Sequence, residues 1–160
     1  MQANHLHLIV EAHDARALSN AIRALEIRIA HRINRLERRK GRLFADRFHT
    51  HDLKTPRETR LCLCYVLQNA RRHAHDRGVQ LPHNWIDPYA SGRWFDGWSI
   101  PITASERPED IPVAYATVWL LTTGWRKLGS IPFEEIPGRQ SSQGRTRLNP
   151  CPGQATTTRS

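Results

Sequence analysis

Apolar residues recur at steps of three and four between residues 14 and 40, and this spacing limits the fold more than any other feature of the chain. Such steps return to one side of an α-helix, so the pattern predicts a long amphipathic helix. Asp14 is placed to cap its N-terminus and Gly41 to end it. The expected buried stripe consists of Leu18, Ile22, Leu25, Ile29, Ile33 and Leu36.

Arginines follow the same spacing beside that stripe. Arg28, Arg32, Arg35 and Arg39 lie roughly a quarter turn away from the apolar residues on a helical projection. This position suits the wall of a groove. A solvated charged face explains the arginines equally well.

A second helix is predicted from residue 56 to about residue 75. Thr55 suits the N-cap, Pro56 the first helical position, and Glu58 completes a capping box. Gly78 marks the end of this helix.

Two faces are expected on the second helix. One is apolar and consists of Leu63, Val66, Leu67, Ala70 and Ala74. Nearly opposite it lie Leu61, Tyr65, Asn69 and Arg72. Tyr65 is therefore not an obvious core residue, although packing beneath the C-terminal tryptophans is an alternative.

Residues 5–11 alternate strictly at first and predict a β-strand. Leu6, Leu8 and Val10 would share its apolar face, and His5 and His7 the opposite face. Residues 42–53 fit an extended segment or an irregular strand.

Charge divides the chain into three parts. Residues 1–78 carry 16 Lys/Arg against 8 Asp/Glu, residues 79–137 carry 4 against 7, and residues 138–160 carry 4 against none. A basic first half in a chain of net charge +9 suits attraction to nucleic-acid phosphates. We interpret residues 1–78 as a catalytic and DNA-binding region.

All five tryptophans and most of the prolines follow residue 78. Residues 79–137 are interpreted as an aromatic-rich extension with a helix near residues 112–121, and with Gly124 and Gly129 bounding a further short turn or helix. The tryptophans would pack in a core rather than stack on unpaired bases. Residues 138–160, which are polar and basic, predict a disordered tail.

The compartment is expected to be the bacterial cytoplasm, with the protein at the nucleoid when it is bound to DNA. No run of about 18 apolar residues and no signal peptide are present. Cys62, Cys64 and Cys151 match neither a disulfide framework nor a zinc quartet. Cys62 and Cys64 are read as small helix residues.

Candidate chemistry lies in two of these elements. Two histidines separated by one residue on a strand project from the same face and offer a metal two imidazoles. His5 and His7 are favoured over two similar pairs because only they belong to an apolar strand. Tyr65 and Asn69 stand one helical turn apart, so the amide oxygen could complete a metal site beside the phenol.

Taken together, these segments resemble the single-tyrosine HUH transposases, and within them the REP-associated tyrosine transposases. The resemblance is carried by residues 4–11 (NHLHLIVE), the arginine-rich helix, residues 44–49 (FADRFH) and residues 65–69 (YVLQN). It covers roughly residues 3–78 in motif order.

The resemblance implies a ferredoxin-like α+β domain that nicks single-stranded or hairpin DNA with Mg²⁺ or Mn²⁺. Tyr65 matches the nucleophile, which would form a 5′-phosphotyrosine, and His5, His7 and Asn69 match the metal ligands. The candidate DNA contacts are Arg28, Arg32, Arg35, Arg39, Arg42, Arg47 and Arg72. Imidazole suits zinc at least as well as magnesium, so the metal is implied by the family alone.

The family domain begins with a strand, a helix and a strand that this chain does not show before His5. The expected fold is thus a partial ferredoxin-like domain of strand, long helix, strand and helix, truncated at its N-terminus. A non-catalytic DNA-binding remnant is the main alternative function, and a zinc metallohydrolase is a weaker one. The oligomeric state stays open, a homodimer included.

Overall fold

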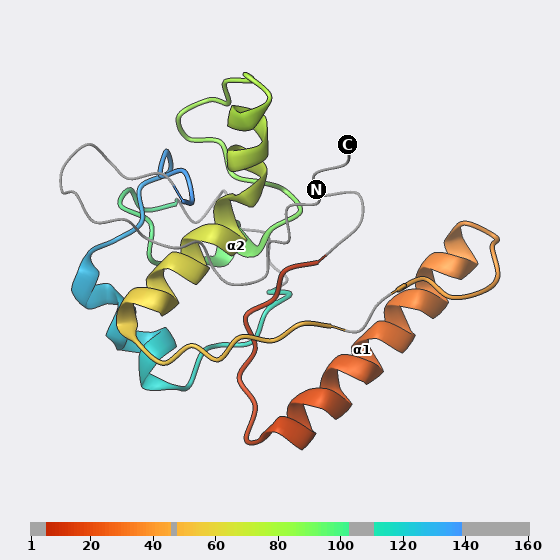
Figure 1. The fold of residues 1–160 in the computed structure, drawn as a ribbon. Coiled ribbons are helices and arrows are strands. Elements are labelled where there is room, and N and C mark those ends of the chain that lie inside the picture. Colours follow the sequence, from red (N-terminus) through yellow and green to blue (C-terminus); the bar gives the residue numbers. More distant parts are fainter. Residues whose placement is uncertain (1–5, 46–47, 103–110, 139–160) are drawn as a thin grey trace, which may run out of the picture. The chain divides into compact units, whose positions relative to one another are not determined.

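The computed structural model describes residues 6–45, 48–102 and 111–138 (Figure 1). The chain divides into two compact units. One contains residues 1–9 and 53–160, and the other contains residues 10–52. The predicted basic tail lies outside the described residues, apart from Gly138.

The described residues are helical, and they contain no β-sheet. Their one β-type pairing is an isolated parallel bridge between Trp98 and Ile131. The predicted ferredoxin-like α+β fold is therefore wrong. A strand is stable only when a neighbouring strand satisfies its backbone groups. Among the described residues, neither residues 6–11 nor the described part of residues 42–53 has such a neighbour.

The first predicted strand is irregular, although its alternation of faces survives. Leu6 and Leu8 are 57% and 47% exposed, whereas His7 between them is half-buried. The apolar side was expected to be covered, and the histidine side is covered instead. His5 lies outside the described residues.

Helix α1 (Ala15–Leu36) begins as predicted. The carboxylate of Asp14 accepts a hydrogen bond from the backbone N–H of Ala17 at 2.7 Å, which lowers the pKa of that carboxyl. The helix ends at Leu36, before Gly41, and Gly41 belongs to the turn that follows with a φ of 101°.

The stripe predicted as the buried side of α1 forms no core. The helix has no buried residue, and Leu36 is 73% exposed. Periodicity reports which residues share a side of a helix, but another element must supply the cover.

Helix α2 (Pro56–Asp76) confirms the predicted capping box. The Thr55 hydroxyl accepts from the N–H of Glu58, and the Glu58 carboxylate accepts from the N–H of Thr55. Gly78 follows the end of the helix with a φ of 73°. The helix is kinked at Gln68, where φ is −117° and ψ is 16°, and the bend is visible in Figure 1.

The described residues of the aromatic-rich segment contain only short helical turns: η1 (Ser91–Trp94), η3 (Leu120–Gly124) and η4 (Trp125–Leu128). The helix predicted at residues 112–121 is misplaced, because residues 111–118 are irregular. Gly124 and Gly129 bound the short turn η4, as predicted, and Gly129 has a φ of 85°. Gly124 is also the last residue of η3, a single π-type turn.

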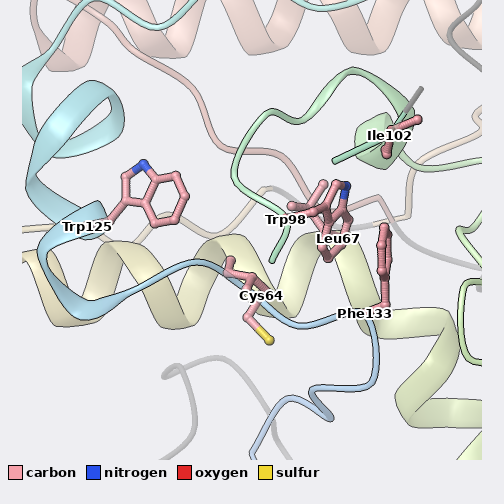
Figure 2. Packing of buried hydrophobic residues seen from close by; sticks show 7 residues of the cluster. Cys64, Leu67, Trp98, Ile102, Trp125 and Phe133 are labelled. Atoms are coloured by element: carbon pink, nitrogen blue, oxygen red, sulfur yellow. The ribbon is translucent and has the colours of Figure 1, made fainter. Parts of the chain in front are cut away.

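The aromatic-rich segment, mostly at residues outside these turns, supplies the core that packs on α2 (Figure 2). The rings of Trp98 and Phe133 are stacked with centroids 4.8 Å apart, and Phe95 contacts both Trp98 and Trp125 at 5.3 Å. Trp98 and Trp125 are thus core residues, as predicted, but Trp119 is 51% exposed, so the prediction is wrong for that residue. The buried cluster consists of Cys64, Leu67, Trp98, Ile102, Trp125, Ile131 and Phe133.

The buried side of α2 differs from the predicted stripe. Leu67 and Ala74 are buried as expected, but Leu63, Val66 and Ala70 are only half-buried. Cys64 is buried in their place and confirms the expectation of a small helix residue; burial raises the pKa of its thiol.

Two arginines of α2 bind the aromatic-rich segment, residues 79–137, to the helix. Arg60 pairs with both carboxylate oxygens of Glu135, at 2.8 and 2.7 Å, which raises the pKa of the guanidinium. Arg71 is buried and donates to the carbonyls of Pro82 and Trp85 at 2.8 and 3.0 Å. Removal from water lowers its pKa.

Among the helices of the described residues, none combines the length and the apolar character needed to cross a bilayer.

Gly97 is required by the packing of the core. A Cβ atom added there would collide with the ring of Trp125 and with that of Phe95. We predict that Gly97→Ala lowers the free energy of unfolding by about 1 to 3 kcal/mol, because the rings must shift. Urea denaturation checks this, with the exposed Ser99→Ala as the matched control. Equal midpoints for the two variants would contradict the packing described.

Candidate tyrosine–histidine site

The structure brings Tyr65 and His7 together, although they are 58 residues apart in the sequence. The phenol oxygen of Tyr65 lies 3.4 Å from Nε2 of His7, and the two rings meet edge to face with centroids 4.9 Å apart. Both residues are half-buried and belong to the same compact unit. A phenol and an imidazole nitrogen therefore lie at the outer limit of hydrogen-bond distance.

Arg72 adds a positive charge on the tyrosine side of α2. Its guanidinium carbon lies 5.9 Å from the centroid of the Tyr65 ring, which is the outer limit of a cation–π contact. Its Nε lies 3.9 Å from the carboxylate of Asp76 one turn further along. The charge near the phenol would attract a phosphate there.

Asn69 follows Tyr65 on the same helix and is only 9% exposed. Its side-chain oxygen is buried and has no hydrogen-bond partner among the described residues. A buried polar atom without a partner costs free energy and calls for an explanation. An amide oxygen is also a ligand that Mg²⁺ and Mn²⁺ accept.

Two of the three predicted metal ligands, His7 and Asn69, lie among the described residues, whereas His5 lies outside them. Within the same residues, no group of three His, Cys, Asp or Glu side chains is gathered closely enough to hold a metal.

The predicted DNA-binding arginines divide between the two units. Arg72 lies in the unit of Tyr65, whereas Arg28, Arg32 and Arg35 are exposed on α1 in the other unit. Arg47 lies outside the described residues.

Arg39 and Arg42 lie in the turn after α1. The guanidinium of Arg39 donates to the carbonyl of Arg42 at 3.2 Å. The side-chain amide of Asn34 donates to the carbonyl of Gly41 at 2.8 Å, which folds this turn back on the helix. Arg39 and Arg42 are exposed and lie in the same compact unit as the exposed arginines of α1.

Gln68, between Tyr65 and Asn69, was missed by sequence reasoning. Its side chain is buried, and its amide nitrogen donates to the carbonyl of Pro132 at 2.7 Å. One weak signal was present: Gln68 is a polar residue that belongs to neither of the two faces assigned to the helix. Its partner lies 64 residues away and could not be identified from the sequence.

The chain shows no significant match to any protein-family model, to any curated protein or to any solved structure.

The unpartnered oxygen of Asn69 predicts an unusual response to mutation. Replacement of Asn69 by leucine, which has a similar volume, removes a polar atom that burial penalises. We expect Asn69→Leu to raise the free energy of unfolding by about 1 kcal/mol when metal is withheld by a chelator. Gln68→Leu is the control, because it destroys a satisfied hydrogen bond and should destabilise. Urea unfolding that ranks the two variants in the opposite order would contradict this description of Asn69.

Proposed function

We propose that the protein cuts and rejoins single-stranded or hairpin DNA through a covalent bond to Tyr65, with the help of a divalent metal. The observation that carries the proposal is the 3.4 Å approach of the Tyr65 phenol to His7. The resemblance of these motifs to single-tyrosine HUH transposases supports the same chemistry. Such a protein would act in the bacterial cytoplasm, and at the nucleoid when bound to DNA.

The proposed reaction is a transesterification. The phenol oxygen of Tyr65 forms a bond to phosphorus, and the bond from phosphorus to the 3′ oxygen breaks. The products are a 5′-phosphotyrosine and a free 3′-hydroxyl, so in net terms the phenol proton moves to the leaving oxygen. The phosphodiester energy is retained, and attack by a 3′-hydroxyl reverses the step.

A phenol is a weak nucleophile at neutral pH and needs help to lose its proton. A cation held by the imidazole of His7, which lies beside the phenol, would favour loss of that proton, and the guanidinium of Arg72 lies near enough to attract the phosphate.

His7 and Asn69, with His5, would hold Mg²⁺ or Mn²⁺. A bound cation would supply positive charge next to the scissile phosphate. The unpartnered oxygen of Asn69 supports this assignment, because it is a ligand atom kept free of competing hydrogen bonds among the described residues.

A non-catalytic DNA-binding protein is the second candidate. The lack of a β-sheet in the described residues favours it, because the related enzymes are expected to build their site on a sheet. The exposed arginines of α1 would suffice for binding to phosphates without any cutting.

Formation of a covalent adduct separates the two candidates. We expect the protein, incubated with labelled single-stranded hairpin DNA and Mn²⁺, to give a band that survives denaturing electrophoresis. Tyr65→Phe should abolish this band, because the attacking oxygen is gone. Tyr89→Phe, at an exposed tyrosine, should leave it unchanged. Binding without an adduct in the unmodified protein would favour the non-catalytic candidate.

The arginines of α1 predict a salt dependence. If Arg28, Arg32 and Arg35 each neutralise a phosphate, the triple change to glutamine should reduce the slope of log affinity against log salt by about 2 for single-stranded DNA. Fluorescence anisotropy across a salt series measures the slope.

A charge-matched control replaces Arg16, Arg23 and Arg93 with glutamine. The first two lie on a different side of α1 from the tested arginines, and all three are exposed. Equal slopes for the two triple variants would mean that Arg28, Arg32 and Arg35 have no special role in DNA binding.

A further inference from the structure

Trp119 differs from the tryptophans of the core, because half of its surface meets water. Trp98 and Trp125 are buried, whereas Trp119 is 51% exposed. A large apolar ring left in water forfeits the free energy of its burial, and exposed aromatic residues are enriched where proteins bind partners. Trp119 directly precedes η3, which with η4 packs against α2, the helix that carries Tyr65. The exposed ring therefore belongs to the same compact unit as the candidate nucleophile.

The backbone of η3 holds the ring of Trp119 in place. In a π-type turn, backbone hydrogen bonds join residues five positions apart, as Trp119 and Gly124 are. A Cβ atom added to Gly124 would come within 2.8 Å of the indole. The glycine therefore lets the ring rest directly on the turn. A ring that is fixed before binding loses little conformational freedom when a ligand stacks on it.

The charge beside Trp119 is positive. The ammonium of Lys127 is exposed and lies 5.1 Å from the centroid of the indole ring. Residues 111–133 contain Arg126 and Lys127 but no Asp or Glu. Arg126 pairs with Asp96 at 2.6 Å, whereas no carboxylate among the described residues forms an ion pair with Lys127. Lys127 is therefore available to a phosphate.

An exposed aromatic ring beside a cation suits an unpaired nucleotide. The base offers a flat face to the ring, and the phosphate next to it attracts the ammonium. A duplex keeps the faces of its bases within its own stack. Tyr115, four residues before Trp119, is 82% exposed and offers a second ring in the same irregular stretch. These features favour a single strand over a duplex.

We propose that Trp119 and Lys127 form a binding surface for single-stranded DNA, in which an unpaired base stacks on the indole and the ammonium contacts a phosphate. The inference rests on the proposed function for the identity of its ligand. It gives the aromatic-rich segment a part in holding the strand, in addition to the arginines of α1. It requires no bound metal.

The test measures affinity for a labelled oligothymidine by fluorescence anisotropy, with a chelator present so that no strand is cut. Trp119→Ala should weaken binding about 5- to 150-fold, because one base loses its stacking partner. Trp119→Leu keeps apolar volume against Gly124 and removes the aromatic ring, so it should act alike and serves if the alanine variant does not fold. Tyr89→Ala, at an exposed aromatic residue elsewhere, should leave the affinity unchanged.

A strand of the same length that has the phosphates but lacks the bases separates stacking from charge. The Trp119 variants should bind this abasic strand as tightly as the unmodified protein does, because it offers no base to stack. Lys127→Gln should weaken the binding of both strands. It should also reduce the slope of log affinity against log salt by about 0.7, the value for one phosphate contact on a single strand.

The stacking role is overturned if the Trp119 variants lose affinity equally for both strands, or for neither. It is also overturned if these variants change the sedimentation of the protein but not its affinity for DNA, because the ring would then contact a second protein copy. A covalent adduct at Tyr65 together with either result would leave the proposed function standing. A loss confined to the base-containing strand, without any adduct, would support the binding surface and contradict the proposed cutting.

Discussion

The unit that contains Tyr65 depends on the packing of aromatic rings against one side of α2. Trp98 and Phe133 stack on each other, Trp125 is 1% exposed, and Cys64 and Leu67 of the helix complete the cluster (Figure 2). This burial is the main source of stability for a segment with little regular structure of its own. It also leaves another side of the helix for Tyr65 and Arg72.

Local signals in the sequence predicted the parts of the fold that are determined locally. Asp14 and Thr55 mark the starts of both long helices, because a capping side chain bonds to backbone only two or three residues away. The alternation at residues 5–11 predicted a strand, but a strand is stable only with a partner that the sequence does not specify. The stripe of α1 failed as a core for a similar reason: periodicity does not identify what covers it.

The candidate site shows the same division. The spacing of Tyr65 and Asn69 and the pairing with His7 came from motif order, and the structure places the phenol beside the imidazole. The hydrogen bond of Gln68, which lies between Tyr65 and Asn69, could not be anticipated, since its partner carbonyl is 64 residues away. Nor could the sequence reveal that the Asn69 oxygen is buried without a partner, because burial is a property of the assembled core.

The pairing of Arg60 with Glu135 joins residues 75 positions apart. The core likewise joins residues of α2 to residues beyond position 97. Contacts of such long sequence range form late, because a long stretch of chain must first be closed into a loop. During synthesis from the N-terminus, α2 therefore leaves the ribosome well before the residues that cover it. A nascent chain that has reached residue 100 already contains Tyr65 and Asn69, but it has neither the carbonyl of Pro132 nor the ring of Phe133 to shape their surroundings.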